Sequence, residues 1–283
     1  MHGKVVVITG ATSGIGQVAA ERLSGMGARL VLVARDRARG AAALSRLRER
    51  GPGLAHRAHY GDLSSVTDTK RVAAEIAAAE PRIDVLINNA GALFNTRRVT
   101  ADGLELTFAT NHVAYAVLTH GLCGRLVAGA PSRVINTASD AHRGARLAFD
   151  DLQAAQGYSG FKVYGRSKLC NILYTRELAR RWTGTGVTAN SLHPGFVATR
   201  FGDQSGGFFS YVVRVAKLFA AISPEKGAET LVYLASSPEV ATITGGYFYK
   251  CALAQPTWEA QDDAAARRLW SETERLAAVS TKL

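Results

Sequence analysis

Short apolar runs rich in valine, leucine and isoleucine alternate along the chain with longer segments whose apolar residues recur at helical spacing. The short runs are typical of strands buried on both faces, because they lack the apolar–polar alternation of a half-exposed strand. This alternation predicts an α/β fold of the Rossmann type: a doubly wound parallel sheet of about seven strands, with helices on both faces. The expected strands span 5–8, 30–33, 55–60, 85–87, 133–137, 187–192 and 246–249. The expected helices span 14–26, 36–50, 64–80, 104–127, 160–181, 224–235 and 257–278.

The chain shows no sign of a division into domains. No stretch has the length or the polarity of a linker, and no internal repeat occurs. Hydrophobic residues make up 47% of the 283 residues and charged residues 20%, a composition that supplies a sizeable core and argues against disorder. We therefore expect a single catalytic domain over residues 1–283.

The formal net charge of +11 raises the question of nucleic-acid binding. The basic residues are scattered through helical segments, however, and do not form the block of about five like charges that marks a binding tail. A bias toward small anionic ligands such as phosphates explains the charge more simply. We expect no nucleic-acid partner.

The cysteines and the start of the chain bear on location. Cys123, Cys170 and Cys251 are far apart and belong to no Cys/His cluster, so neither a disulfide framework nor a metal site is expected. The N-terminal residues lack the pattern of a signal peptide, and no run reaches the ~18 apolar residues of a transmembrane helix. These features predict a cytoplasmic protein with reduced thiols and no transmembrane segment.

A glycine-rich turn lies between the first expected strand and the first expected helix. Gly10 allows a tight turn, Gly14 lets a phosphate approach the backbone, and Gly16 lets the helix pack closely on the sheet. The free N–H groups and the positive end of the helix would then face a pyrophosphate. The turn therefore predicts a dinucleotide-binding site.

Four further motifs follow in order, each at a strand end or on a helix. They are Asp62-Leu63, Asn88-Asn89-Ala90-Gly91, the Tyr164…Lys168 pair, and Pro194-Gly195. With the TGxxxGxG spacing of the glycine turn, they make the chain resemble the short-chain dehydrogenase/reductase family over essentially its whole length. The resemblance implies a dinucleotide site formed by Gly10, Thr12, Ser13, Gly14, Ile15, Gly16, Asp62, Leu63, Asn89, Ala90, Gly91, Tyr164, Lys168, Pro194, Val197 and Thr199.

The end of the second strand selects the cofactor in this family. An acidic residue there would bind the 2′-hydroxyl of NAD, whereas an arginine accommodates the 2′-phosphate of NADP. Here the corresponding residue is the neutral Ala34, followed by Arg35, with Arg39 one helical turn further on. These residues favour NADP(H). Solvated charges at the start of a helix are the alternative for the two arginines, and Asp36 either offers a carboxylate to a ribose or caps the helix.

The reacting centre is expected on the helix that carries Tyr164 and Lys168, which lie four residues apart and hence on one face. A nearby ammonium should lower the pKa of Tyr164 and make it a better proton donor or acceptor near neutral pH. Ser139, just beyond the fifth strand, would orient the substrate oxygen, with Thr137 as the less favoured alternative. Asn111 matches the family's helix asparagine, which implies support for a water linked to the lysine. In the implied mechanism, NADPH delivers hydride to a carbonyl carbon and Tyr164 donates the proton.

Other segments narrow the branch of the family. The 25-residue interval from Ser139 to Tyr164, and the segments 140–143, 149–152, 167–173 and 269–272, resemble the retinol-dehydrogenase-like branch. That branch includes retinoid enzymes and bacterial ketoreductases of antibiotic pathways. We expect reduction of a ketone or aldehyde on a hydrophobic molecule, such as an aromatic polyketide. A retinoid or aliphatic alcohol dehydrogenase is the alternative, and an inactive NADP-binding regulator is a weaker one.

The residues after the Pro-Gly motif bear on the substrate. The resemblance implies a substrate lid around residues 200–222, and the apolar, basic segment 208–219 fits a mobile lid over a hydrophobic ketone. An amphipathic helix on a membrane or on another subunit, and ordinary core packing, are the alternatives. A homodimer and a homotetramer are both open as assemblies.

Overall fold

The computed structural model describes residues 1–195 and 222–279, which share one eight-stranded sheet. The strand order is β3-β2-β1-β4-β5-β6-β7-β8, and every neighbouring pair is parallel except β7 and β8. All seven expected strands are present. They are β1 Val5–Thr9, β2 Arg29–Ala34, β3 Arg57–Tyr60, β4 Val85–Asn88, β5 Ser132–Thr137, β6 Val187–Leu192 and β7 Tyr247–Tyr249. The order reverses between β1 and β4, the position at which doubly wound sheets bind ligands.

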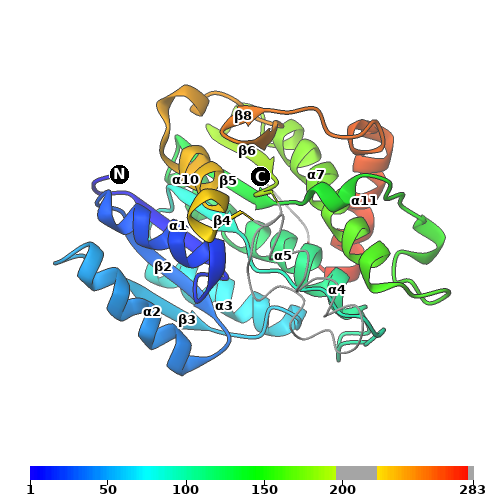
Figure 1. Cartoon of the computed structure of the whole chain (residues 1–283), viewed down its shortest axis with the longest axis horizontal. Helices are drawn as coiled ribbons and strands as arrows, with labels where there is room; N and C mark the ends of the chain where they lie inside the picture. Colours follow the sequence, from blue (N-terminus) through cyan, green and yellow to red (C-terminus); the bar gives the residue numbers. More distant parts are fainter. Residues whose placement is uncertain (196–221, 280–283) are drawn as a thin grey trace.

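Helices cover both faces of the sheet, as expected for this fold class (Figure 1). One face carries α1 Gly14–Gly25, α2 Arg37–Arg50, α9 Pro224–Gly227 and α10 Glu229–Ser236. The other carries α3 Val66–Ala79, α5 Ala114–Gly121, α6 Cys123–Ala128 and α7 Gly160–Arg181. The last helix, α11 Asp263–Ala277, packs against α7.

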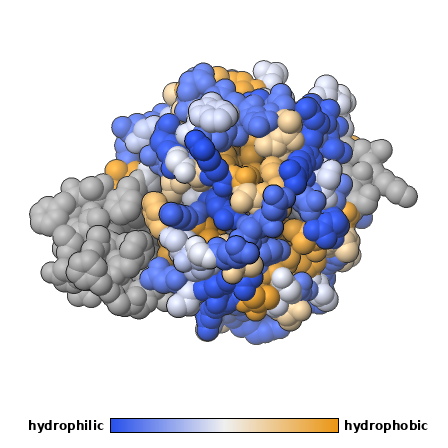
Figure 2. All heavy atoms as spheres, turned by 90° about the vertical axis from the view of Figure 1, so that its right-hand side faces the viewer, coloured by the Kyte–Doolittle hydropathy of each residue, from blue (hydrophilic) through white to orange (hydrophobic). Residues whose placement is uncertain are grey.

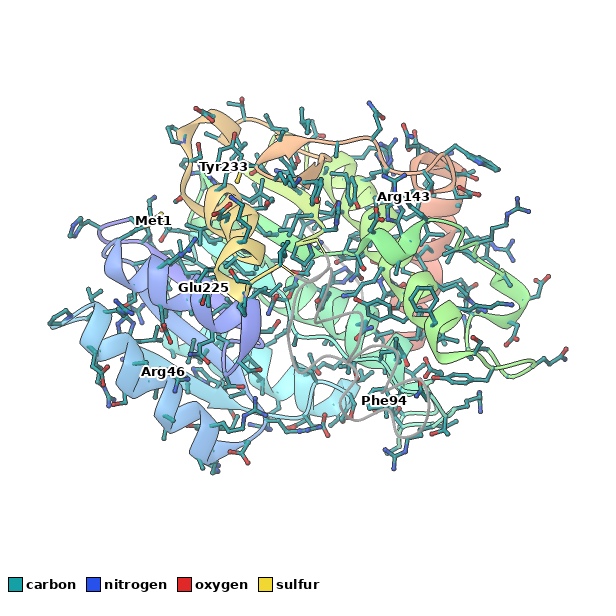
Figure 3. All side chains as sticks on the ribbon, viewed as in Figure 1. Met1, Arg46, Phe94, Arg143, Glu225 and Tyr233 are labelled. Atoms are coloured by element: carbon teal, nitrogen blue, oxygen red, sulfur yellow. The ribbon has the colours of Figure 1, made fainter. Side chains whose placement is uncertain are left out.

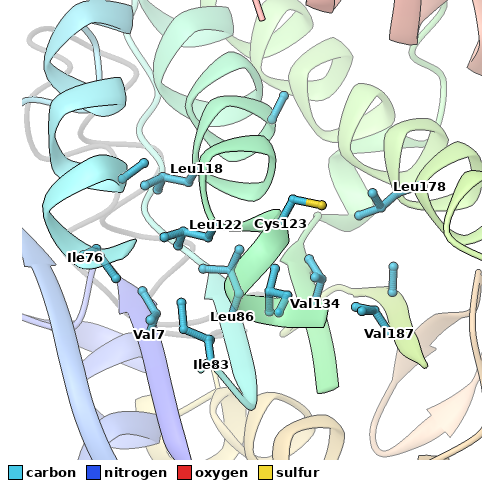
Figure 4. Packing of buried hydrophobic residues seen from close by; sticks show 14 of the residues in the cluster. Val7, Ile76, Ile83, Leu86, Leu118, Leu122, Cys123, Val134, Leu178 and Val187 are labelled. Carbon is cyan, nitrogen blue, oxygen red and sulfur yellow. The ribbon is translucent and has the colours of Figure 1, made fainter. Parts of the chain in front are cut away.

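Alternate residues of each central strand point to opposite faces of the sheet and so contribute to two separate hydrophobic cores. Val6 and Ile8 of β1 pack with α1, α2 and α10, whereas Val5 and Val7 pack with α3, α5 and α7. Figure 4 shows the second cluster, in which Cys123 is a buried member among aliphatic side chains. Burial on both faces explains why the strands read as continuous apolar runs.

The helix expected over 104–127 is interrupted. It consists of α4 Leu106–Phe108, a π-helical turn Ala109–Val113, then α5 and α6. A π turn holds one residue more than a regular α turn, and such turns are frequent at functional sites. The turn contains Asn111, a candidate catalytic residue.

The C-terminal part also differs from expectation. A two-residue strand β8, Ala252–Leu253, pairs antiparallel with β7. The turn between them holds Lys250 and Cys251 at φ of 49° and 60°, a conformation that normally calls for glycine or asparagine. No such residue marked the hairpin in the sequence. The helix expected from 257 begins only at Asp263, where Asp262 caps it by accepting hydrogen bonds from Ala264 and Ala265 N–H.

Several expectations fall on residues 196–221. Val197, Thr199, the segment 208–219 and nearly all of the lid lie outside the described residues. Within the parts of the chain that the structure describes, no helix combines the length and apolar character needed to cross a bilayer.

Candidate active site

The glycine turn after β1 is held tightly against the loop after β4. Gly10 has φ of 70°, a left-handed conformation that favours glycine. A Cβ atom on Gly16 would lie 2.4 Å from the Gly10 carbonyl oxygen and 2.5 Å from Asn89 Nδ2. Asn89 Nδ2 donates to the Thr9 carbonyl at 3.1 Å. The turn therefore has no space for a side chain at position 16.

The N-terminus of α1 is open to an anion. Ser13 occupies the N-cap position in an extended conformation, but its side chain makes no capping hydrogen bond, and the first turn holds no acidic residue. Thr12 and Ser13 precede the helix, and Ile15 lies in its first turn. Uncapped N–H groups at the positive end of a helix bind phosphate well. The residues present thus fit the pyrophosphate of a dinucleotide.

The residues after β2 fit an additional phosphate. Ala34 is buried, and Arg35 and Arg39 are exposed just beyond it. The Asp36 carboxylate accepts a hydrogen bond from Arg39 N–H at 2.7 Å and so caps α2. Of the two roles considered for Asp36, the structure supports the cap. Arg37, which the sequence interpretation did not single out, lies with its guanidinium 4.7 Å from the Tyr60 ring centroid.

The other expected cofactor residues that the structure describes follow the carboxyl ends of the strands along the same edge of the sheet. Asp62 follows β3, and its Oδ1 accepts from Ser64 N–H and from the Ser64 hydroxyl; Leu63 packs against the core. Asn89 and Ala90 N–H groups both donate to the Thr9 hydroxyl at 2.9 Å. Pro194 and Gly195 follow β6, where Gly195 has φ of 85°.

Ser139, Tyr164 and Lys168 come together beyond the carboxyl end of β5. Ser139 lies two residues after the strand, and its side chain is hydrogen-bonded to Tyr164 on α7. The Lys168 ammonium lies 5.5 Å from the Tyr164 ring centroid and donates to the Thr137 carbonyl at 3.0 Å.

Tyr164 and Lys168 are 8% and 2% exposed, so both functional groups are largely shielded from water. Figure 3 labels Phe94, which lies on the segment after β4, and Arg143, which lies on the segment after β5.

Burial dominates the protonation of this pair. It raises the pKa of Tyr164 to about 12, an effect that the hydrogen bond with Ser139 partly opposes. It also lowers the pKa of Lys168 to about 7. The expected lowering of the Tyr164 pKa is therefore not found in the free protein, because desolvation favours the neutral form of both groups.

Asn111 connects the π turn to this centre. Its Oδ1 accepts from Ala92 N–H at 2.8 Å, and its Nδ2 donates to the Ala92 carbonyl and to the Ser167 hydroxyl. A Cβ atom on Gly91 would lie 3.2 Å from Asn111 Oδ1 and 3.3 Å from Lys168 Nζ. The loop after β4 thus lies directly against Asn111 and Lys168. A water linked to the lysine stays a prediction.

The sequence interpretation missed three residues at this site. Tyr115 donates to the Ala90 carbonyl at 2.9 Å, and the Lys168 ammonium lies 5.7 Å from the centroid of the Tyr115 ring.

His142 Nδ1 lies 2.7 Å from the Ser139 carbonyl oxygen, and His142 Nε2 accepts a hydrogen bond from Thr257 N–H. Asn171 donates to the Thr137 carbonyl at 3.1 Å. The sequence could have indicated Asn171, because it follows Lys168 by three residues and therefore lies on the same face of the helix.

Comparisons with known proteins agree with this geometry. The short chain dehydrogenase family matches residues 4–206. Retinol dehydrogenase 14 of Homo sapiens is 40% identical over 97% of this chain and 86% of its own length. Retinol dehydrogenase 13 of Homo sapiens is also 40% identical, over 97% and 84%.

Solved structures show the same architecture. An uncharacterized protein from Mycobacterium paratuberculosis superposes with a TM-score of 0.80 at 29% identity, covering 100% of this chain and 96% of that one. RhlG of Pseudomonas aeruginosa, solved as an active-site complex with NADP, gives a TM-score of 0.70 at 27% identity, covering 87% and 94%.

Proposed function

Because the chain belongs to the short-chain dehydrogenase family, as its motifs predicted, we propose that it is an NADPH-dependent carbonyl reductase acting on a hydrophobic small molecule. The observation that carries the proposal is the meeting of Ser139, Tyr164 and Lys168 beside the glycine turn and the open N-terminus of α1. This arrangement is the reason that we favour an active enzyme over an inactive NADP-binding regulator.

The residues divide the chemistry among themselves. The nicotinamide of a bound NADPH would supply the hydride to the carbonyl carbon. Ser139 orients the carbonyl oxygen by hydrogen bonding, and the Tyr164 hydroxyl donates the proton that turns this oxygen into an alcohol. Lys168, when charged, stabilises the resulting phenolate. Asn111 holds the loop after β4 and helps to restore the proton.

Replacing Tyr164 by phenylalanine tests the assignment. The change removes only the proton donor, so turnover should fall by about 10³-fold or more while NADPH binding persists. The assay follows NADPH oxidation with aromatic polyketide ketones, retinal and simple aryl ketones, and protein fluorescence follows binding. Turnover at the wild-type rate would refute the role of Tyr164.

We further propose that Arg35 selects NADPH over NADH. Its exposed guanidinium stands where the 2′-phosphate is expected, and the nearest acid, Asp36, is engaged as a helix cap. Arg35→Asp should weaken NADPH binding by about 10- to 100-fold, because a charge-assisted contact is replaced by repulsion, and NADH binding should change little. Arg50→Asp, the same charge change at the far end of α2, is the matched control. A wild-type preference for NADH would contradict the proposal.

A second candidate is the oxidation or reduction of a retinoid. The relatives that share 40% of their residues with this chain are named retinol dehydrogenases, and they match almost its entire length. Retinal and retinol therefore belong in the substrate panel, and the ratio of their kcat/KM values to those of aryl ketones decides between the candidates. A cytoplasmic location stays a prediction, as do the single catalytic domain and the lid.

A further inference from the structure

A buried row of polar side chains runs from Lys168 to the C-terminal helix. Its members are Asn171 on α7, His112 in the π turn and Thr273 on α11. None is more than 1% exposed. Buried polar groups are costly unless each is hydrogen-bonded, so such a row calls for a reason.

Asn171 is bonded to both sides of the catalytic centre. Its Nδ2 donates to the Asn111 carbonyl at 2.9 Å and to the Thr137 carbonyl at 3.1 Å. The Thr137 carbonyl also accepts from the Lys168 ammonium at 3.0 Å. A carbonyl oxygen has two lone pairs, so Asn171 occupies one and leaves the other for the lysine. The direction in which Lys168 reaches is thereby restricted.

His112 fixes which way the Asn171 amide points. Both N–H bonds of the amide go to carbonyls, so its Oδ1 can only accept, and it faces His112 Nδ1 at 3.3 Å. This arrangement places the proton of the neutral imidazole on Nδ1, and it requires the Thr273 hydroxyl to donate to Nε2 rather than to the Leu269 carbonyl, which lies 2.7 Å from that hydroxyl. His112 Nε2 lies 2.9 Å from the Thr273 hydroxyl, and the rings of Phe108 and Tyr174 contact the imidazole. Complete burial lowers the pKa of His112 to about 4, which keeps the ring neutral.

We propose that Asn171 is a positioning residue of the carbonyl reduction, holding the Asn111 and Thr137 carbonyls so that Lys168 is directed toward Tyr164, and that His112 holds the Asn171 amide in the required orientation. The inference rests on the proposed function for its effect on turnover. Its effect on Lys168 is independent of any substrate. Neither Asn171 nor His112 touches the reacting atoms.

Three variants test the proposal. Asn171→Asp keeps the shape but replaces the donor with a carboxylate near the ammonium. His112→Phe keeps a buried ring and removes the donor to Oδ1, whereas His112→Asn restores a donor near the position of Nδ1. Cys170→Ala, at a buried position of the same helix without a role in the row, controls for general loss of packing.

Two readouts separate positioning from a structural role. NMR titration of ε-¹³C-labelled lysine, assigned with Lys168→Met, reports the pKa of Lys168 in the free protein. We expect Asn171→Asp to raise that pKa by at least about one unit, because a carboxylate close by favours the ammonium. Steady-state assays with a carbonyl that the wild type reduces should show kcat lowered by about 10- to 100-fold for Asn171→Asp and His112→Phe, with little change in NADPH affinity.

These measurements distinguish a positioning role of Asn171 and His112 from a purely structural one. His112→Asn should recover most of the kcat lost in His112→Phe, and Cys170→Ala should keep the wild-type pKa and kcat. The proposal is overturned if folded Asn171→Asp and His112→Phe proteins retain the wild-type Lys168 titration and kcat. If the wild type reduces no carbonyl but the Lys168 titration shifts as expected, the proposed function fails while the placement of Lys168 by Asn171 stands.

Discussion

At the scale of single residues, the site depends on close approaches between the turn after β1, the loop after β4 and the catalytic side chains. Gly16 lies directly against the Gly10 carbonyl and the Asn89 side chain, and Gly91 lies against the side chains of Asn111 and Lys168. These approaches hold the turn after β1 against the loop after β4, beside the proposed pyrophosphate site. Small changes in this region should affect cofactor binding before they affect the fold.

Gly16→Ala tests this tightness. The added Cβ would lie 2.4 Å from a backbone oxygen, so the turn must shift, and we expect NADPH affinity to fall by about 100-fold with a stability loss of about 1–3 kcal/mol. Gly124→Ala, in a helix with nothing within 4 Å of the new atom, should leave binding intact and stabilise the protein slightly. Fluorescence titration and urea unfolding give both quantities. Equal behaviour of the two variants would contradict the account.

Lys168 should cost stability because it is charged and buried. Its pKa in the folded protein is lowered to about 7, so at and below that pH folding must bury an ammonium, and the cost shrinks as pH rises toward the unfolded value of 10.5. Lys168→Met should therefore abolish turnover yet raise the free energy of unfolding at pH 6.5 by about 3 kcal/mol, even after the loss of one hydrogen bond. Urea unfolding at pH 6.5 and 9.5 checks both the gain and its decline. A destabilised variant at pH 6.5 would contradict it.

The residues that the sequence could identify are those whose spacing is local. Tyr164 and Lys168 share one helix face, and the glycines share one turn, so a motif records them directly. His142 and Asn171 have partners that come from distant segments of the chain, Thr257 for His142 and Asn111 for Asn171. Such contacts depend on tertiary packing, which no local pattern encodes. The pKa of Tyr164 was misjudged for the same reason, since its burial depends on the whole fold.

At the scale of elements, regular segments were predictable and irregular ones were not. The seven expected strands appear, and the signal is strongest for β1, β2 and β4, because burial on both faces leaves a continuous apolar run. The π turn at Asn111 keeps a helical pattern of side chains and so escapes notice. Strand β8 depends on a hairpin whose two turn residues, Lys250 and Cys251, carry no turn signal.

The cap of α2 offers an element-scale test. Asp36 satisfies a free N–H at the start of this helix, so Asp36→Ala should lower the free energy of unfolding by about 1 kcal/mol, whereas Asp36→Asn should nearly preserve it. The preference for NADPH over NADH should be unchanged in Asp36→Asn, because the carboxylate serves the helix rather than a ribose. A switch in cofactor preference would show that Asp36 faces the cofactor after all.

At the scale of the whole molecule, buried histidines should set the acid limit of stability. Burial lowers the pKa of His112, His120 and His193 to about 4, below the ordinary 6.5. The unfolded chain therefore binds more protons than the folded one between pH 6.5 and 4, so stability is complete above pH 6.5 and is lost as pH falls toward 4, by up to about 1.4 kcal/mol per pH unit for each histidine.

Urea unfolding between pH 7 and 4.5 measures this slope. His193→Phe keeps the stacking on Tyr247 and Tyr249 and removes one titrating group, so its slope should be shallower by about one proton. A flat profile in the wild type would exclude these histidines as the cause.

The placement of α11 has a consequence for assembly. Its inner side, including Leu269 and Trp270, is buried, and Trp270 stacks on Tyr174 of α7. Its outer side carries exposed arginines such as Arg267 and Arg268, and polar side chains predominate on the face seen in Figure 2. The outer surface of α7 is thus already occupied within one chain. Copies of this protein that join into a homodimer or homotetramer must meet through other surfaces, or else displace their own last helix.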